Sequence, residues 1–208
     1  MLREKLAAIV LSLPLLVLFI TSISYWVTYR KKEKEASSKQ QIGYNMFYLT
    51  LVGIGYFSIW PIWLGGIVLL FLEQYGSGVS ILMFHLPKTG FVQIAGLVIL
   101  YTGSLLFAWS ISYARKYLRP STSGIHEDHE LLKDGPLGIV RHPYYVSYVL
   151  ILIGLSLALT SWLPLIFTFS VIAGMGPAAR AEEVQLKELF GEEYEQYEKK
   201  VGRFFPKL

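Results

Sequence analysis

The sequence has no cysteine and few charged residues. None of its 208 residues is Cys, and Asp, Glu, Lys and Arg together make up 16% of the chain. The absence of cysteine excludes disulfide scaffolds, zinc–thiolate sites, iron–sulfur clusters and cysteine nucleophiles. Soluble domains contain about 25% charged residues, so this chain has too few to cover a surface in contact with water. The composition therefore excludes an ordinary cytosolic globular domain, a disordered chain and a basic nucleic-acid-binding domain.

Apolar sequence is abundant instead. Hydrophobic residues account for 53% of the chain, and the mean hydropathy is +0.45. A membrane-spanning helix requires roughly 20 mainly apolar residues. Pro61 is expected to tilt or kink one long helix rather than divide it, because the second half would be too short to cross alone. The sequence thus predicts an all-α integral membrane protein with five transmembrane helices. These are residues 6–29, 44–72, 91–113, 144–160 and 161–177.

The last two predicted spans are short and are separated by residues 160–164, with the sequence TSWLP. Ser161 is a favourable helix N-cap, and a proline in the first helical turn needs no backbone N–H. A tight turn at this point predicts a helical hairpin, followed by a cytoplasmic C-terminal helix and tail. Apolar residues of the tail keep helical spacing up to Gly191, which is expected to end the helix.

Positive charges are distributed unevenly between the predicted loops. Segments 30–43 and 114–143 each hold five Lys or Arg residues, and the tail from residue 178 holds six, whereas the opposite side has only three. The positive-inside rule therefore predicts an external N-terminus, with the two long basic loops and the C-terminal tail in the cytoplasm. The length of the first apolar stretch, followed by basic residues 30–32, favours a membrane anchor over a cleaved signal peptide.

Polar residues suited to ligand binding or catalysis lie in two of the predicted cytoplasmic segments. Arg141 and His142 stand before Pro143 at the start of the fourth span, and Glu182 and Glu183 follow the fifth. Because a hairpin starts and ends on the same side of the membrane, it brings these two segments together. A purely structural interpretation also exists for each: a boundary arginine, a histidine bound to a carbonyl, and glutamates on a solvated amphipathic helix.

The motifs of these segments occur in a characteristic order. They read Gly-Pro-x-x-x-Val-Arg-His-Pro-x-Tyr, then Glu-Glu-x-x-Leu, Phe-Gly-x-x-Tyr-x-x-Tyr and Val-Gly-Arg-Phe-x-Pro. Over residues 129–208 this order resembles the isoprenylcysteine carboxyl methyltransferases, part of a wider superfamily of membrane methyltransferases that includes phospholipid N-methyltransferases. The resemblance implies an S-adenosylmethionine-dependent enzyme in the plasma membrane of a prokaryote. Its acceptor would be prenylated or otherwise lipid-like, with no nucleic acid and no obligate protein partner.

The resemblance also implies which parts of the chain span the membrane and which parts form the site. Residues 1–113 would form three N-terminal membrane spans, and residues 114–208 would form the catalytic part. Catalytic roles are implied for Arg141, His142 and Glu183. The implied cofactor-binding residues are His129, Glu130, Leu131, Leu132, Leu137, His142, Pro143, Tyr144, Tyr145 and Glu182.

The sequence departs from the family pattern at two positions. Leu137 stands where the family usually has tyrosine, which removes one expected cofactor contact. Ala178 stands where the family has a substrate-side arginine, and the nearby Arg180 is the other residue assigned to substrate binding. Positions two residues apart on a helix differ in direction by about 200°, so Arg180 cannot simply replace the missing side chain. Either the local backbone differs here, or the substrate is not the carboxylate that such an arginine would hold.

The sequence is also compatible with two other functions and contains one histidine pair that could suggest a metal site. A membrane reductase related to the NADPH-dependent sterol reductases has a similar C-terminal region but needs more spans. A non-catalytic membrane protein of the same fold is supported by Ala178. His126 and His129 form a lone His-x-x-His pair that suits a loop more than a metal site, so no metal is predicted. Tyr194 and Tyr197 are expected to pack the tail back rather than bind a ligand.

Overall fold

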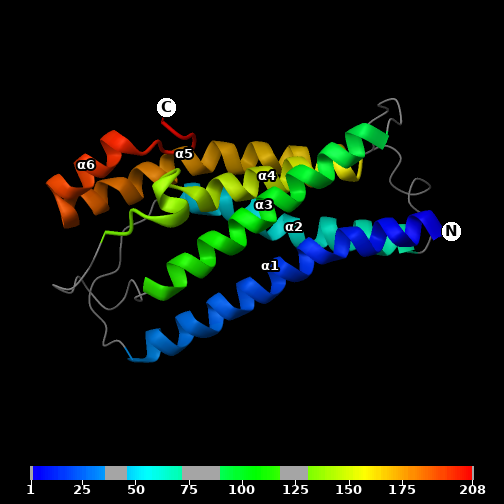
Figure 1. The fold of residues 1–208 in the computed structure, drawn as a ribbon, viewed down its shortest axis with the longest axis horizontal. Coiled ribbons are helices and arrows are strands. Elements are labelled where there is room, and N and C mark those ends of the chain that lie inside the picture. Colours follow the sequence, from blue (N-terminus) through cyan, green and yellow to red (C-terminus); the bar gives the residue numbers. More distant parts are fainter. Residues whose placement is uncertain (1, 36–45, 72–89, 118–130, 208) are drawn as a thin grey trace.

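A computed structural model of the chain describes residues 2–35, 46–71, 90–117 and 131–207. Within these ranges the chain is helical, apart from loops and one isolated bridge. The elements are α1 (Leu2–Glu35), α2 (Met46–Phe71), α3 (Gly90–Tyr117), the short 3₁₀ helix η3 (Gly135–Gly138), α4 (Pro143–Ala158), α5 (Trp162–Phe190) and α6 (Glu192–Lys200). The long helices run lengthwise in a bundle, with α6 at the end opposite to the N-terminus (Figure 1). The predicted all-α fold class is confirmed.

Two of the described helical segments are long and apolar enough to cross a membrane. They are Gly90–Ala114 and Trp162–Phe190, which contain 18-residue windows with mean hydropathies of 1.9 and 1.5, respectively. Shorter apolar helical segments cover Ala8–Ser24, Phe57–Val68 and Pro143–Ala158. The number of five transmembrane helices therefore stays a prediction.

Large apolar side chains also cover the outside of the bundle. Phe57, Phe91 and Phe169 are 71%, 79% and 67% exposed, respectively. Exposed apolar surface on several helices is unfavourable in water and is typical of a surface that contacts lipid or another apolar partner. Together with the hydropathy of the long helices, this surface supports a membrane protein.

The position of α4 is fixed by close packing against α3. A Cβ atom at Gly96 would collide with the backbone nitrogen of Ala158, and one at Gly154 would collide with the backbone nitrogen of Leu100. Small residues at such contacts allow two helix backbones to approach closely. These contacts hold the C-terminal half of α4 against α3. Near the start of α4, the ring centroid of Tyr144 lies 5.1 Å from that of Phe107 on α3.

The turn between α4 and α5 has the cap that the sequence predicts. The Ser161 hydroxyl accepts a hydrogen bond from the backbone N–H of Leu163 at 3.3 Å. The Ser161 backbone N–H in turn donates to the carbonyl of Ser156 at 2.9 Å. Thr160 reverses the chain with φ of 47°, a conformation that non-glycine residues seldom adopt. The structure confirms Ser161 as the N-cap.

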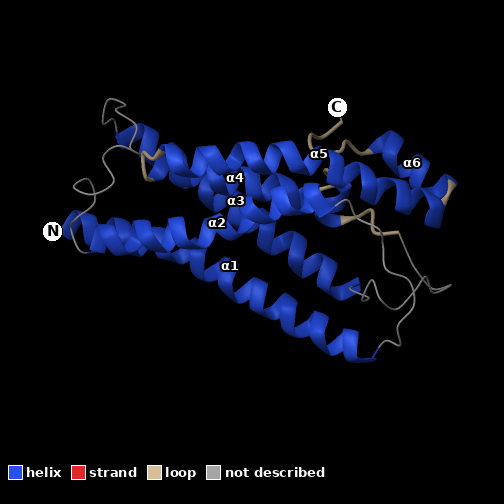
Figure 2. Cartoon of the chain, turned by 180° about the vertical axis from the view of Figure 1, so that it is seen from behind, coloured by secondary structure: helices blue, strands red, loops and turns tan. Residues whose placement is uncertain are grey.

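The end of the last predicted span differs from expectation. The apolar segment 161–177 does not end as a separate helix, because α5 continues through Pro177 as one helix until Gly191, whose φ is 51°. Gly191 ends the helix as predicted, and α2 likewise continues through Pro61. The polar residues after position 177 are therefore rigidly connected to the apolar part of α5. Figure 2 shows this helix passing beside α6 at the end of the bundle.

Candidate functional site

The loop before α4 and the C-terminal tail lie side by side. Val140 and Gly202 form a parallel bridge. The backbone N–H of Arg141 donates to the carbonyl of Gly202 at 2.8 Å, and that of His142 donates to the carbonyl of Arg203 at 3.1 Å. The predicted meeting of the two polar segments is thus observed, and the tail takes part through backbone as well as side-chain contacts.

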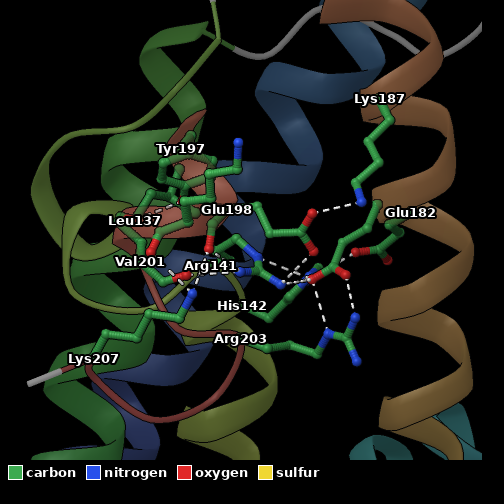
Figure 3. A network of polar contacts seen from close by, with 12 residues as sticks. Leu137, Arg141, His142, Glu182, Lys187, Tyr197, Glu198, Val201, Arg203 and Lys207 are labelled. Atoms are coloured by element: carbon green, nitrogen blue, oxygen red, sulfur yellow. Dashed lines mark hydrogen bonds and ion pairs between the residues drawn. The ribbon is translucent and has the colours of Figure 1, made fainter. Parts of the chain in front are cut away.

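A buried carboxylate on α5 is the centre of the contacts. The side chain of Glu183 is 4% exposed. Its oxygens accept from Arg141 Nε at 3.0 Å and Nη2 at 2.8 Å, from His142 Nε2 at 3.1 Å, and from Arg203 Nε at 2.9 Å and Nη2 (Figure 3). A buried charge is tolerated when it is paired and hydrogen-bonded in this way. Glu183 therefore joins the loop, α5 and the tail.

His142 lies between two carboxylates. Its Nδ1 is 3.3 Å from Oε2 of Glu182, and its Nε2 is 3.1 Å from Oε1 of Glu183. Ionised carboxylates only accept hydrogen bonds, so this arrangement suits the imidazolium, in which both ring nitrogens donate. Burial by itself lowers the pKa of His142, but the hydrogen bonds and charges of Glu182 and Glu183 outweigh it and raise the pKa above 6.5. In this arrangement His142 holds its proton and orients Glu182.

Glu182 differs from its neighbour in being accessible. Its side chain is 30% exposed, and its Oε1 accepts a hydrogen bond from the Tyr145 hydroxyl at 2.7 Å. The rings of His142, Tyr145 and Phe204 lie near one another, with centroids 5.8, 5.9 and 6.5 Å apart. An accessible carboxylate beside aromatic rings suits a ligand that carries hydroxyl donors and a positive charge.

Helix α6 holds the loop from the other side. Arg141 donates from Nη1 to the carbonyls of Val201 at 2.7 Å and Glu198 at 3.1 Å, and its Nη2 is 3.2 Å from Oε1 of Glu198. The Tyr197 hydroxyl donates to the carbonyl of Leu137 at 2.7 Å. Tyr194 and Tyr197 are buried in a small apolar cluster with Leu131 and Val201. Their predicted packing role is confirmed.

The remaining residues predicted to bind cofactor have varied surroundings. Leu131 is buried in the cluster with Tyr194, and Leu132 and Leu137 are partly buried. Pro143 is buried as the first residue of α4. Tyr144 is partly buried, with its ring centroid 5.1 Å from that of Phe107. His129 and Glu130 lie outside the described residues. The cofactor-binding roles themselves stay predictions.

The two residues predicted to bind substrate lie on different sides of α5. Ala178 is buried in the apolar core, whereas Arg180 is exposed. This agrees with the difference in direction expected on a helix. The arginine that reaches Glu183 from outside the loop is Arg203, to which sequence reasoning gave no role. Arg203 belongs to the motif Val-Gly-Arg-Phe-x-Pro, which is part of the family resemblance. That motif was the sequence signal that could have marked Arg203 as a site residue.

The described residues include no group of three or more His, Asp or Glu side chains that could hold a metal ion. The functional groups of the site are instead carboxylates, arginines, one histidine and aromatic rings. They suit binding and orientation of an organic ligand through hydrogen bonds, charge and ring contacts.

The chain is similar in sequence to known methyltransferases. Residues 91–193 match the phospholipid methyltransferase family. A protein-S-isoprenylcysteine O-methyltransferase of Schizosaccharomyces pombe is 34% identical over 82 residues, which are 39% of this chain and 35% of that protein. Probable protein-S-isoprenylcysteine O-methyltransferases of Oryza sativa subsp. indica and subsp. japonica are each 26% identical over 129 residues, 61% of this chain and 68% of theirs. The match thus spans about a third of the length of the S. pombe relative.

Proposed function

This chain belongs to the superfamily of membrane methyltransferases that includes the phospholipid methyltransferases, and we propose that it methylates a lipid-like acceptor with S-adenosylmethionine as the methyl donor. The reaction is of the isoprenylcysteine carboxyl O-methyltransferase type. Support for this type comes from the names of the S. pombe and rice relatives and from the motif order over residues 129–208.

The observation that carries the proposal is the accessible Glu182 carboxylate beside an aromatic wall. We define this wall as the rings of His142, Tyr145 and Phe204. The residues fit the methyl donor chemically: a carboxylate can accept hydrogen bonds from the ribose hydroxyls, and the neutral rings of Tyr145 and Phe204 attract a sulfonium cation. When bound, S-adenosylmethionine supplies an electrophilic methyl group: a bond forms from the acceptor oxygen to carbon as the carbon–sulfur bond breaks, leaving S-adenosylhomocysteine.

The protein's own contribution is positioning. Glu183 joins Arg141, His142 and Arg203 and so fixes the loop relative to the tail. His142 and Tyr145 both hydrogen-bond Glu182, which restricts its carboxylate to one orientation. Holding reactants in a productive orientation lowers the entropic part of the barrier without covalent catalysis. Arg141, His142 and Glu183, which the resemblance marks as catalytic, act here as positioning residues.

An apolar groove supports a lipid-like acceptor. It has a volume of about 540 Å³ and lies between α1 and α2, where its lining includes Leu16, Phe19, Trp60 and Leu64. Leu16, Phe19 and Leu64 are more than half exposed, so the groove opens at the surface of the bundle. An acceptor with an isoprenoid or acyl chain would enter from the bilayer with its polar end at the cytoplasmic face.

The membrane arrangement that accompanies this function has five spans. Segments 6–29, 44–72, 91–113, 144–160 and 161–177 cross the bilayer, with the N-terminus outside and the tail in the cytoplasm. The distribution of Lys and Arg supports this orientation. Residues 114–208 form the catalytic part, and the membrane is the plasma membrane of a prokaryote.

A transfer assay in detergent or proteoliposomes tests the function. Tritiated methyl groups should be incorporated into a prenylcysteine acceptor, and Glu182→Ala and His142→Ala should reduce incorporation at least tenfold, because each removes a hydrogen bond at a charged group. Glu192→Ala, at an exposed position at the start of α6, serves as the control and should retain activity. Calorimetry that detects no binding of S-adenosylhomocysteine to the wild-type protein would refute the proposal, and binding of NADPH would favour the reductase.

A further inference from the structure

The polar cluster around Glu183 has an excess of positive charge. Its members are joined by ion pairs and include four basic groups and three carboxylates. The basic groups are Arg141, His142, Lys187 and Arg203, and the carboxylates are Glu182, Glu183 and Glu198. With His142 protonated, the cluster holds one positive charge that its own carboxylates do not balance. A site of this kind favours an anionic ligand.

The two arginines of the cluster differ in how many donors they use. Arg141 donates five hydrogen bonds, to the side chains of Glu183 and Glu198 and to the carbonyls of Glu198 and Val201. A guanidinium has five N–H donors, so Arg141 has none left, and its side chain is only 6% exposed. Arg141 is therefore a structural cation.

Arg203 retains donors. It uses Nε and Nη2 on Glu183, and its side chain is 31% exposed. Its remaining amino group, Nη1, donates no hydrogen bond to the residues that the structure describes. Among the residues that the structure describes, Glu183 is the one side chain that pairs with Arg203. Arg203 is therefore an accessible cation of the cluster that still has donors for a ligand.

The position of Arg203 relative to the aromatic wall is also fixed. Its carbonyl accepts from the backbone N–H of His142, and the next residue, Phe204, contributes a ring to the wall. The guanidinium is attached to the backbone that borders the proposed methyl-transfer site. Because Glu183 binds one edge of the guanidinium, the orientation of the opposite edge is also restricted.

We propose that the free edge of Arg203 binds a carboxylate group of a ligand at the methyl-transfer site. This inference rests on the proposed function. The planar guanidinium offers two parallel N–H groups, which match the geometry of a carboxylate. Ala178 has no donor, and Arg180 is exposed on α5 without an ion pair among the described residues. Arg203 thus supplies the cation that the sequence lacks at position 178.

The carboxylate can come from the amino-acid arm of the methyl donor or from the acceptor. Calorimetry on the full chain in detergent distinguishes these sources. S-Adenosylhomocysteine carries the arm, and 5′-methylthioadenosine lacks it. If the arm is the ligand, Arg203→Gln weakens S-adenosylhomocysteine binding roughly tenfold or more and leaves 5′-methylthioadenosine binding unchanged.

If the acceptor supplies the carboxylate, S-adenosylhomocysteine binding is unchanged in Arg203→Gln. The KM for N-acetyl-S-farnesylcysteine then rises roughly tenfold or more. The affinity for its methyl ester, which lacks the charge, does not change. Lys200→Gln removes an exposed positive charge from the last turn of α6 and is the control for non-specific electrostatics.

Two results would overturn the inference. One is equal weakening of S-adenosylhomocysteine and 5′-methylthioadenosine binding, which indicates that Arg203 only maintains the site. The other is that Arg203→Gln changes neither the binding of the two nucleosides nor the KM or affinity for N-acetyl-S-farnesylcysteine and its methyl ester. Arg203→Lys keeps the charge beside Glu183 while removing the planar fork, so it gives the same comparison if the glutamine variant fails to fold. A wild-type protein that binds neither nucleoside would instead refute the proposed methyl-donor site.

Discussion

At the scale of single residues, two adjacent glutamates have different surroundings and different proposed roles. Glu183 is buried and paired with three cations, whereas Glu182 is accessible and held by Tyr145 and His142. Adjacent helix positions point about 100° apart, so one carboxylate faces the loop and tail while the other borders the site. The pair could be identified from the sequence. Which of the two is buried in ion pairs and which is accessible depends also on Arg203, twenty residues further along the chain, and could not be predicted.

Removal of the charge of Glu183 should destabilise the protein strongly. Glu183→Gln leaves Arg141 and Arg203 buried or partly buried without their shared carboxylate, and breaking a buried ion pair costs about 3–5 kcal/mol. The melting temperature in detergent should fall by several degrees. Glu193→Gln, which removes an exposed pairing with Lys133, should have little effect. Similar melting temperatures for both variants would show that the cluster does not stabilise the fold.

The contribution of His142 to stability should depend on pH. Burial lowers its pKa, but Glu182 and Glu183 outweigh burial and raise it in the folded protein. Tyr145 lies beside the ring, and Arg141 and Arg203 share Glu183 with it. A raised folded pKa means that protonation favours the fold: the contribution is complete below the unfolded value, about 6.5, and is lost as the pH rises through the folded value.

The difference in melting temperature between wild type and His142→Gln should therefore be largest near pH 6 and decrease at alkaline pH. Nuclear magnetic resonance of labelled histidine gives the pKa directly. A difference that grows with pH would show that His142 is neutral in the folded protein.

At the scale of elements, short-range sequence signals predicted helix ends correctly, whereas the length of α5 was predicted incorrectly. Ser161 and Gly191 act through contacts with near neighbours, so residue type and spacing predicted both helix ends. The continuation of α5 through Pro177 was missed because the apolar composition ends there, whereas the helix does not. Hydropathy reports the surroundings of a helix, and backbone hydrogen bonding determines where it ends.

Close packing of α3 against α4 can be tested with a pair of glycines. Gly154→Ala places a Cβ against the backbone of Leu100, so the helices must separate, at a cost of about 1–3 kcal/mol. Gly176→Ala lies in α5 with no atom within 4 Å of the added Cβ, and it should be neutral or stabilise the helix by up to about 1 kcal/mol. Thermal unfolding in detergent measures both. Equal effects would contradict backbone-to-backbone packing.

At the scale of the whole molecule, the two polar segments were predicted to meet because a short hairpin returns the chain to its starting side. The lengths of the apolar segments and the turn at residues 160–164 are sufficient for this prediction. The path of the tail could not be obtained in this way. The bridge between Val140 and Gly202 and the pairing of Arg203 with Glu183 are contacts between distant parts of the chain that no local pattern specifies.

The proposed orientation can be tested by labelling, because the chain has no native cysteine. Single variants Lys88→Cys and Lys200→Cys place a thiol in a predicted external loop and in the predicted cytoplasmic α6. In intact cells an impermeant maleimide should label only the first, and after lysis it should label both. Labelling of Lys200→Cys in intact cells would reverse the proposed topology.

The continuity of α5 has a mechanical consequence. At 1.5 Å per residue, its 29 residues form a rod about 43 Å long that carries the exposed Phe169 in its apolar part and Glu183 near its far end. A thicker or thinner bilayer would change the angle of this rod and so displace Glu183 from its partners on the loop and tail. The lipid composition of the host membrane is thus expected to regulate the site directly.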